Sequence, residues 1–308
     1  MKKYLWGILY GLLLTAFSVY ILLDTFVITR IYTTVPDDDD GESSVIVEDN
    51  DNENSKTTQP GSSSVAPTEN SYSDKSISIT ITEYRENDTT IYVADVQLDS
   101  AEYLQTAFAN SAYGKNVTEK TSEIAKDNNA ILAINGDYYG TQKKGYVIRN
   151  GVLYRDTVSG DQEDLVIYAD GSFEIITEKS VSAEDLLAAG AQQVLSFGPA
   201  LVMNGQISVT EDEEVGKAKS SNPRTAIGII DELHYVLVVS DGRTDESEGL
   251  SLYELAEFMQ SLGTTVAYNL DGGGSSTMVF NGEVINNPTT NGKSIKERSV
   301  SDIVYIGY

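Results

Sequence analysis

The chain has 308 residues, a formal net charge of -26, a single histidine and no cysteine. Nucleic-acid binding needs a basic surface, so this acidic composition predicts no nucleic-acid partner. The absence of cysteine excludes a disulfide framework, a cysteine-ligated zinc site and a thiol nucleophile. With one histidine, His234, a histidine-rich metal site is excluded as well, and we interpret that residue as structural.

The N-terminus predicts a membrane anchor. Lys2 and Lys3 precede an uncharged, largely apolar run from Tyr4 to Leu23, which is long enough to cross a bilayer. Because acidic residues dominate the segment after this run, the positive-inside rule places the N-terminus in the cytoplasm and the main domain outside the cell. A cleaved signal peptide is the alternative, although no small-x-small cleavage site follows the run. Residues 1–35 are therefore expected to form a cytoplasmic tip and a single-pass anchor in the cell membrane.

Residues 36–75 have the composition of an acidic, disordered linker. The segment opens with four aspartates, Asp37 to Asp40, and continues with Ser, Thr, Pro, Gly and further acidic residues. It offers too little apolar surface to offset the entropy of ordering the chain. Its charges repel one another, so we expect an extended stalk.

Residues 76–308 predict one α+β domain of mixed, strand-rich sheets with a few packed helices, preceded by the single transmembrane helix. The clearest helix begins at Ser251, where Glu254 completes a capping box, and ends at Gly263. Two shorter helices are expected after Ser182 and between Thr118 and Asp127. Segments rich in Ile, Val, Thr and Tyr predict strands, namely Ile77–Thr82, Thr90–Val96, Ala130–Asn135, Leu165–Tyr168, Phe173–Ile176, Thr225–Ile230, Tyr235–Val239, Thr265–Leu270, Thr277–Phe280 and Ile303–Ile306.

The segment 268–277, Tyr-Asn-Leu-Asp-Gly-Gly-Gly-Ser-Ser-Thr, is the first candidate site. Its aspartate is expected where a strand ends, and the glycines after it let backbone N–H groups approach an anion closely. A carboxylate beside such an anion cradle can act on a reacting carbon while the cradle holds negative charge. A glycine-rich hairpin with an Asx turn is the alternative. The candidate residues are Asn269, Asp271, Gly272, Gly273, Gly274, Ser275 and Ser276.

A second candidate segment suits a carbohydrate. Asn135, Gly136, Asp137, Tyr138 and Tyr139 come after an apolar strand and combine an amide, a carboxylate and two aromatic rings in one turn. Sugar rings stack on aromatic faces while polar side chains bind their hydroxyl groups. A surface turn that carries tyrosines is the alternative.

Two arginines and a further aspartate complete the candidates. Arg224 opens a predicted strand and Arg298 precedes the last one, so each suits recognition of a phosphate or carboxylate, although structural salt bridges are equally common. Asp241, followed by Gly242 and Arg243, comes directly after another predicted strand. The same three residues also fit a plain turn.

Taken in order, these segments resemble the phosphodiester glycosidase family, which includes bacterial proteins associated with exopolysaccharide. The resemblance covers most of residues 76–308. One motif departs from it, because the family more often has Asn-Gly-Gly-Phe-Phe where this chain has Asn-Gly-Asp-Tyr-Tyr at 135–139. The extra carboxylate and hydroxyl groups suggest a different substrate.

The resemblance implies hydrolysis of a sugar-1-phosphodiester in an envelope glycopolymer or exopolysaccharide. The phosphate would be bound by Arg224, Arg298 and the amides of Gly272 to Ser275. Asp271 would act as nucleophile or base, with Asp137 or Asp241 as the second acid. Two alternatives stay open: a non-catalytic carbohydrate-binding module, and a phosphodiesterase in which the three aspartates hold a calcium or magnesium ion and the P–O bond is cut. No cofactor is otherwise expected.

Overall fold

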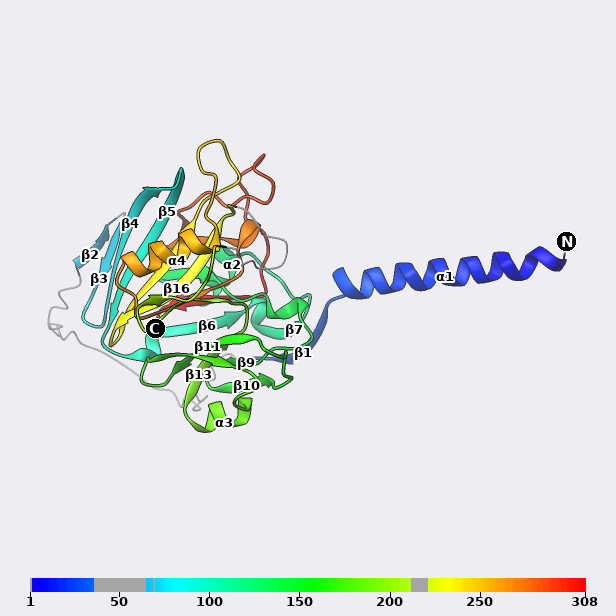
Figure 1. Ribbon diagram of the computed structural model, residues 1–308, viewed down its shortest axis with the longest axis horizontal. Coiled ribbons are helices and arrows are strands. Elements are labelled where there is room, and N and C mark those ends of the chain that lie inside the picture. Colours follow the sequence, from blue (N-terminus) through cyan, green and yellow to red (C-terminus); the bar gives the residue numbers. More distant parts are fainter. Residues whose placement is uncertain (1, 36–64, 69, 212–220) are drawn as a thin grey trace, which may run out of the picture.

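The computed structural model describes residues 2–35, 65–68, 70–211 and 221–308 (Figure 1). In this part of the chain, antiparallel strands form sheets of nine, five, five and two strands, and short helices pack on them. A long helix, α1, projects from the globular part. The architecture confirms the predicted α+β class with strand-rich sheets.

The nine-stranded sheet is the largest layer of the domain. It carries helix α4 (Leu252–Ser261) on one face. In spatial order its strands are β15 (Gln206–Ile207), β14 (Ala200–Met203), β18 (Val266–Asn269), β16 (Arg224–Asp231), β17 (His234–Ser240), β5 (Thr89–Leu98), β4 (Ile77–Glu86), β3 (Ser71–Ser73) and β2 (Val65–Thr68).

The two five-stranded sheets each carry one short helix. The first packs α3 (Ala183–Ala188) and has the order β10 (Val152–Arg155), β9 (Val147–Arg149), β13 (Ala191–Leu195), β11 (Glu163–Tyr168) and β12 (Phe173–Thr177). The second packs α2 (Thr121–Asp127) and has the order β20 (Glu283–Val284), β19 (Met278–Phe280), β8 (Leu132–Asn135), β21 (Asp302–Ile306) and β6 (Leu104–Phe108). Single 3₁₀ turns lie at Ala101–Tyr103, Ala109–Ser111, Tyr139–Thr141 and Gly273–Ser275.

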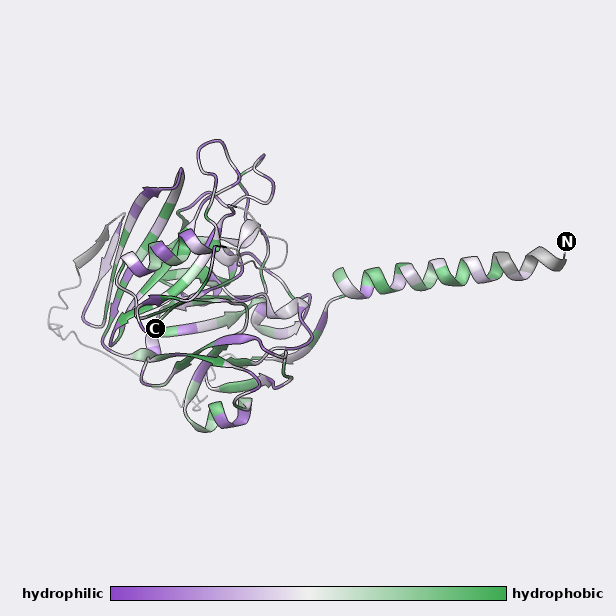
Figure 2. Ribbon diagram, in the orientation of Figure 1, coloured by the Kyte–Doolittle hydropathy of each residue, from purple (hydrophilic) through white to green (hydrophobic). Residues whose placement is uncertain are grey.

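Strand β17 shows why the central strands are apolar along their whole length. Tyr235, Leu237 and Val239 belong to the core shared with the other sheets, whereas Val236 and Val238 face the core under α4. Side chains alternate between the two faces of a strand, so a strand covered on both faces is apolar at every position. Figure 2 shows the resulting concentration of hydrophobic residues in the middle of the domain.

The helices follow the predicted capping signals. The Ser251 hydroxyl accepts a hydrogen bond from the Glu254 amide (3.1 Å), and the Glu254 carboxylate accepts one from the Ser251 amide (2.7 Å). Gly263 follows the helix with φ of +86°, a conformation that glycine adopts without strain. Helix α3 likewise begins after Ser182, whose hydroxyl caps the Asp185 amide.

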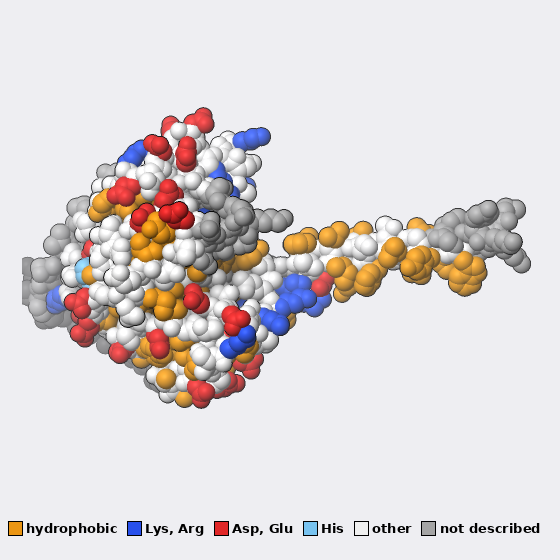
Figure 3. Space-filling view, in the orientation of Figure 1, with side chains coloured by type: hydrophobic (Ala, Val, Ile, Leu, Met, Phe, Trp, Pro, Cys, Tyr) orange, Lys and Arg blue, Asp and Glu red, His pale blue; other side chains and the backbone are white. Residues whose placement is uncertain are grey.

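Helix α1 (Lys2–Phe26) is 25 residues long, or about 37 Å at 1.5 Å per residue. This exceeds the roughly 30 Å of a bilayer core. Its window Leu9–Phe26 has a mean hydropathy of 1.7, and none of that window is buried against the domain. Apolar side chains line the projecting helix in Figure 3. Length and composition suit both a membrane anchor and a signal sequence.

The end of α1 is joined to the domain by a two-stranded sheet. Strand β1 (Arg30–Thr34) pairs with β7 (Ala112–Lys115), and Asp24 at the end of the helix forms ion pairs with Arg30 and Lys115. The Asn116 side-chain amide donates to the Ile28 carbonyl oxygen (3.0 Å). Figure 3 shows Lys and Arg side chains gathered where the helix meets the domain.

The folded region therefore extends upstream of residue 76, the boundary expected from composition. Within the predicted linker, β2 and β3 add to the edge of the nine-stranded sheet beside β4. The remainder of that linker, residues 36–64 and 69, lies outside the described residues.

Candidate functional site

The sheet topology brings three predicted site residues, Arg224, Asp241 and Asp271, to the same end of three adjacent strands. Strand β16 lies between β17 and β18 and is antiparallel to both. Arg224 at the start of β16 is therefore next to the ends of its neighbours, which continue into Asp241 after β17 and Asp271 after β18. The register confirms this placement, because Arg224 pairs with Ser240 and the Leu270 amide donates to the Thr225 carbonyl oxygen (2.9 Å).

The segment from Asp271 to Thr277 crosses from this sheet to a second one. It leaves β18 and enters β19, which pairs with β8. Asn135 at the end of β8 holds the crossing in place, because its side-chain amide donates to the Asp271 carbonyl oxygen (2.6 Å). Its side-chain oxygen accepts from the Thr225 hydroxyl (2.8 Å) and the Thr277 amide (3.2 Å). Asn135 is fully buried, and these hydrogen bonds fix the position of the Asp271 backbone.

Asp271 contacts Arg298 and begins the glycine-rich segment, Asp271 to Thr277. One of its carboxylate oxygens lies 3.1 Å from the Arg298 guanidinium, which also donates from Nε to the Ser275 hydroxyl oxygen (2.9 Å). The Asp271 amide donates to the Gly136 carbonyl oxygen (3.1 Å), which brings the second candidate segment to the first. Burial raises the pKa of Asp271, and the opposite charge of Arg298 partly offsets that rise. The side chain nevertheless keeps 12% of its surface exposed, so a ligand can reach it.

Gly273 and Gly274 occupy positions where a side chain would be strained or would clash. Gly273 has φ of +64°, and a Cβ atom there would lie 2.9 Å from the Arg243 guanidinium. A side chain at Gly274 would overlap Thr290. Two of the amides expected to face a phosphate are used within the chain, since Gly273 donates to the Pro223 carbonyl oxygen (2.8 Å) and Ser275 to that of Gly272 (3.3 Å). These two donors are therefore already bonded within the chain, so the amide cradle is smaller than expected.

Three arginines surround the glycine-rich segment. Arg224 is buried, and its Nε donates to the Leu250 carbonyl oxygen (2.8 Å). Burial, together with the nearby Arg243 guanidinium, lowers the pKa of Arg224 to about 10. Arg243 in turn lies close enough to Arg298 for the two positive charges to repel each other. Arg243 was not among the residues predicted from sequence, and its guanidinium lies beside Gly273.

The Asp241 carboxylate accepts hydrogen bonds from amide donors. One carboxylate oxygen accepts from the Asn287 backbone amide (2.8 Å) and the other from the Asn287 side chain (2.9 Å). The Asn286 side chain also donates to Asp241 (3.3 Å) and to the Ser276 carbonyl oxygen (3.0 Å). Asp241 thereby connects the end of β17 to the glycine-rich segment through Asn286.

Asp137 has a different environment from the one expected of a catalytic acid. Its carboxylate is completely buried and lies 2.9 Å from the guanidinium of Arg149 on β9, which also forms an ion pair with Asp302 on β21 (2.8 Å). The Ser196 amide donates to the same Asp137 oxygen (2.7 Å). Burial opposes the charge on Arg149, but the two carboxylates outweigh it and raise its pKa. The three residues form a structural ion cluster that joins both five-stranded sheets.

The two tyrosines of the second segment point in different directions. Tyr139 is buried and stacks on Tyr113 with ring centroids 5.3 Å apart. Tyr138 is 41% exposed and has φ of +67°, an uncommon conformation for a residue with a side chain. Of the two rings, Tyr138 is therefore the one available to a sugar.

The predicted aspartates do not converge on one point. Asp137 is bound to Arg149, Asp241 to two asparagines and Asp271 to Arg298. Among the residues that the structure describes, no group of three or more His, Cys, Asp or Glu side chains is arranged to hold a metal ion. His234 opens β17 with its Nε2 atom 3.1 Å from Asp95, which agrees with a structural role.

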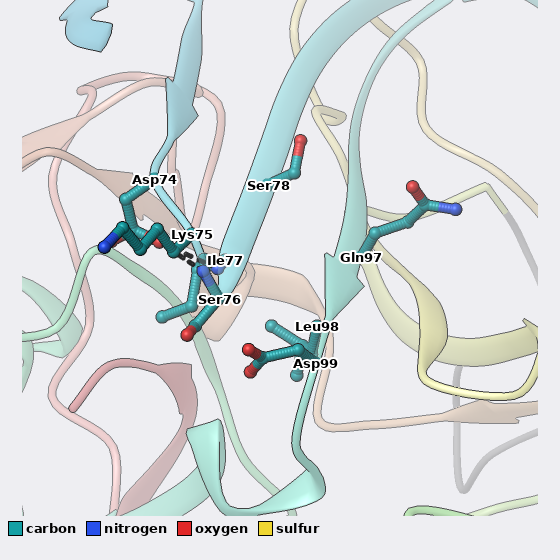
Figure 4. Close-up of a pocket in the computed structure, with 8 residues that line it drawn as sticks. All are labelled: Asp74, Lys75, Ser76, Ile77, Ser78, Gln97, Leu98 and Asp99. Atoms are coloured by element: carbon teal, nitrogen blue, oxygen red, sulfur yellow. Dashed lines mark hydrogen bonds between the residues drawn. The ribbon is translucent and has the colours of Figure 1, made fainter. Parts of the chain in front are cut away.

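A shallow pocket of about 210 Å³ lies elsewhere, at the ends of β4 and β5 (Figure 4). Asp74 accepts hydrogen bonds there from the amides of Ser76 and Ile77, both at 2.9 Å, so the pocket contains a tight turn. None of the predicted site residues contributes to its lining, which consists of Asp74, Lys75, Ser76, Ile77, Ser78, Gln97, Leu98 and Asp99.

Comparison with known proteins shows the family of the chain. The family model for phosphodiester glycosidases matches residues 128–307, which include Asp271, Arg298 and the ends of β8, β16 and β17. The chain belongs to the phosphodiester glycosidase family. Its family relatives include the bovine N-acetylglucosamine-1-phosphodiester alpha-N-acetylglucosaminidase, 30% identical over 184 residues, with 54% of this chain and 34% of the bovine protein covered. The uncharacterized SPbeta prophage-derived protein YomE of Bacillus subtilis is 29% identical over 204 residues, with 65% of this chain and 31% of YomE covered.

The fold of the family is also seen in a solved structure. The catalytic domain of zebrafish N-acetylglucosamine-1-phosphodiester alpha-N-acetylglucosaminidase superposes with a TM-score of 0.60 at 22% identity, covering 75% of this chain and 83% of that domain. The chain spans about a third of the length of the bovine and Bacillus relatives. Similarity to them therefore concerns the phosphodiester glycosidase domain, and the shared architecture confirms the fold expected from sequence.

Proposed function

We propose that this phosphodiester glycosidase hydrolyses the bond between the anomeric carbon of a sugar and the oxygen of a phosphodiester. The observation that carries this proposal is the pairing of the partly exposed Asp271 carboxylate with Arg298, on a glycine-rich segment that Arg224 and Arg243 also border. A carboxylate beside clustered guanidinium groups suits a substrate with a cationic transition state at carbon and an anionic leaving group.

The leaving group explains why so few acids are needed. When the carbon–oxygen bond breaks, the electron pair stays on the phosphate oxygen, and the product is a phosphate monoester that is stable without immediate protonation. The arginines would bind this phosphate, since planar guanidinium groups match its oxygens. Hydrolysis then requires one group to attack the anomeric carbon or to activate water.

Asp271 is the proposed catalytic carboxylate, as nucleophile or as base. Burial raises its pKa, which means that the ionised form is poorly solvated and correspondingly reactive, while Arg298 keeps it in place. We assign Asp137 and Asp241 positioning roles in place of the catalytic roles expected from sequence, because both carboxylates are occupied by neighbouring donors. Tyr138 is proposed to bind the sugar ring.

We further propose that α1 anchors the domain outside the cell, near phosphodiester-linked polymers of the envelope. The apolar length of α1 and the two lysines at its N-terminal end support this placement. Strand β1 supports a domain held close to the membrane rather than on a long stalk, because its pairing with β7 starts four residues after the helix ends.

The test uses the full chain in detergent, sugar-1-phosphodiester substrates and water enriched in ¹⁸O. We expect the label in the released sugar, and we expect Asp271→Asn to lower kcat by about 100-fold or more without a change in thermal unfolding. The matched control is Asp161→Asn, which removes an exposed carboxylate that forms an ion pair with the exposed Lys179. Label in the phosphate would show P–O cleavage, and wild-type activity in Asp271→Asn would refute the assignment. Binding of envelope polymer without product release would instead favour a binding module.

A further inference from the structure

We propose that Arg243 contacts the phosphate and gives the site a preference for a doubly charged phosphate group over a singly charged one. This inference rests on the proposed function, because it names the group of the substrate that the arginine would bind. It assigns a specificity role to a residue whose sequence context, Asp-Gly-Arg after a strand, also fits a plain turn.

Arg243 is built into the site by two glycines. Its guanidinium packs on Gly273, where any side chain would approach the Nη2 atom to 2.9 Å. Its carbonyl oxygen lies against Gly292, where a Cβ atom would overlap it. The backbone of Arg243 has φ of +62°, which costs energy in a residue with a side chain, and its amide donates to the Glu248 carbonyl oxygen (3.1 Å). The chain thus holds this arginine in a defined place at a local energetic cost.

Neutral groups hold the guanidinium in place. Its Nε and Nη2 atoms donate to the side-chain oxygen of Asn222 at 3.1 and 2.8 Å, and Nη1 donates to the Thr290 carbonyl oxygen at 2.7 Å. Arg149 and Arg298 form ion pairs with carboxylates. In the part of the chain that the structure describes, Arg243 forms no such ion pair. The side chain is therefore oriented while its positive charge stays uncompensated.

Neighbouring arginines add positive charge around Arg243. Arg298 lowers the pKa of Arg243 in addition to the effect of burial, and Arg243 does the same to Arg224. The Asp271 carboxylate pairs with Arg298, and the nearby Asp241 carboxylate accepts hydrogen bonds from Asn286 and Asn287. A bound anion would relieve this repulsion, and the excess of positive charge favours an anion with more than one negative charge.

The proposed reaction creates such an anion. A phosphodiester carries one negative charge, and cleavage of its carbon–oxygen bond leaves the electron pair on oxygen, so the phosphate monoester carries two. Water supplies the hydroxyl that joins the anomeric carbon, and its proton goes to the base or to solvent. The Arg243 guanidinium would therefore stabilise the departing phosphate more than the bound diester. Stronger binding of the departing group as its charge develops lowers the barrier and accelerates the reaction.

The test measures binding of two simple probes to the full chain in detergent by titration calorimetry at pH 8. Methyl phosphate is doubly charged there and dimethyl phosphate singly charged. We expect the wild type to bind methyl phosphate at least about tenfold more tightly than dimethyl phosphate. Arg243→Gln should narrow this ratio to within about threefold, and Arg243→Lys should restore part of it. Lys179→Gln is the control, because it removes one exposed positive charge elsewhere on the surface.

The outcomes separate this inference from the proposed function. Equal affinity of the wild type for both probes, no binding of either, or an unchanged ratio in an Arg243→Gln protein with wild-type thermal unfolding would each overturn the inference. Hydrolysis of a sugar-1-phosphodiester could still occur in all three cases. Conversely, an Arg243-dependent preference for methyl phosphate without hydrolysis would support the inference while refuting the proposed function.

Discussion

Asp164 on β11 is predicted to make the protein less stable as the pH rises. The residue is completely buried, and neither of its carboxyl oxygens has a hydrogen-bond partner among the described residues. Burial, with added repulsion from Glu178, raises the pKa of Asp164 from 3.8 to about 9. In the unfolded chain the same group ionises near its ordinary value.

The sign and size of the effect depend on this difference. Between about pH 4 and pH 9 the unfolded chain loses the Asp164 proton while the folded chain retains it, so the free energy of unfolding falls as the pH rises. The slope is about 1.4 kcal/mol per pH unit, or about 4 kcal/mol between pH 5 and pH 8. The contribution of Asp164 to stability is fully present below the pKa of the unfolded chain, and it is lost as the pH rises to the pKa of the folded chain.

Replacement of Asp164 by asparagine isolates the effect from other titrating groups. The asparagine side chain would keep the shape without a charge, so the stability of Asp164→Asn relative to wild type should grow by about 1.4 kcal/mol per pH unit from pH 5 to pH 8. Urea unfolding of the full chain in detergent measures this difference, with Asp161→Asn as a control because that carboxylate is exposed. A difference that stays constant across this pH range would refute the reasoning.

Two further predictions concern the ion cluster and the junction with α1. Arg149→Gln leaves the buried carboxylates of Asp137 and Asp302 without their cation. We therefore expect the free energy of unfolding, measured in urea, to fall by about 3–5 kcal/mol at pH 7 and to recover partly at pH 5. Equal stability of the variant and the wild type at pH 7 would contradict the structural role of the cluster. The double variant Thr34→Cys and Ala112→Cys places cysteines at paired positions of β1 and β7, in a chain with no other cysteine. Mild oxidation should consume both thiols, and two thiols that stay reactive in the folded protein would show that β1 is not docked on β7.

The sequence predicts those helices and strands that are determined by residues close together in the chain. The capping box at Ser251 and the doubly covered strand β17 could be recognised because the residues that specify them are adjacent in the chain. Strands β6 and β13 have the sequences LQTAF and AQQVL, which are not rich in β-branched residues. They become strands by pairing with β21 and β11, so tertiary contacts override a weak local preference.

The candidate site shows the same limit. Asp271, Arg224 and Asp241 were identified because each lies at the end of an apolar strand, and antiparallel pairing brings such ends together. The position of Arg243 depends on contacts with Asn222 and Thr290 and on a positive φ, none of which a pattern of neighbouring residues reveals. The orientation of Arg243 is therefore set by residues that are distant in the sequence, whereas the strand before it could be predicted from its own residues.

The departure from the common family motif at residues 137–139 illustrates how such contacts change an interpretation. From sequence, the carboxylate and the two hydroxyl groups all suggested a different substrate. In the structure, Asp137 pairs with Arg149, which also pairs with Asp302, and the Tyr139 ring is buried against Tyr113. Both side chains are thus buried inside the domain and are not presented to a ligand. Only Tyr138 remains exposed, so a change in sugar preference at this segment would have to come from its ring.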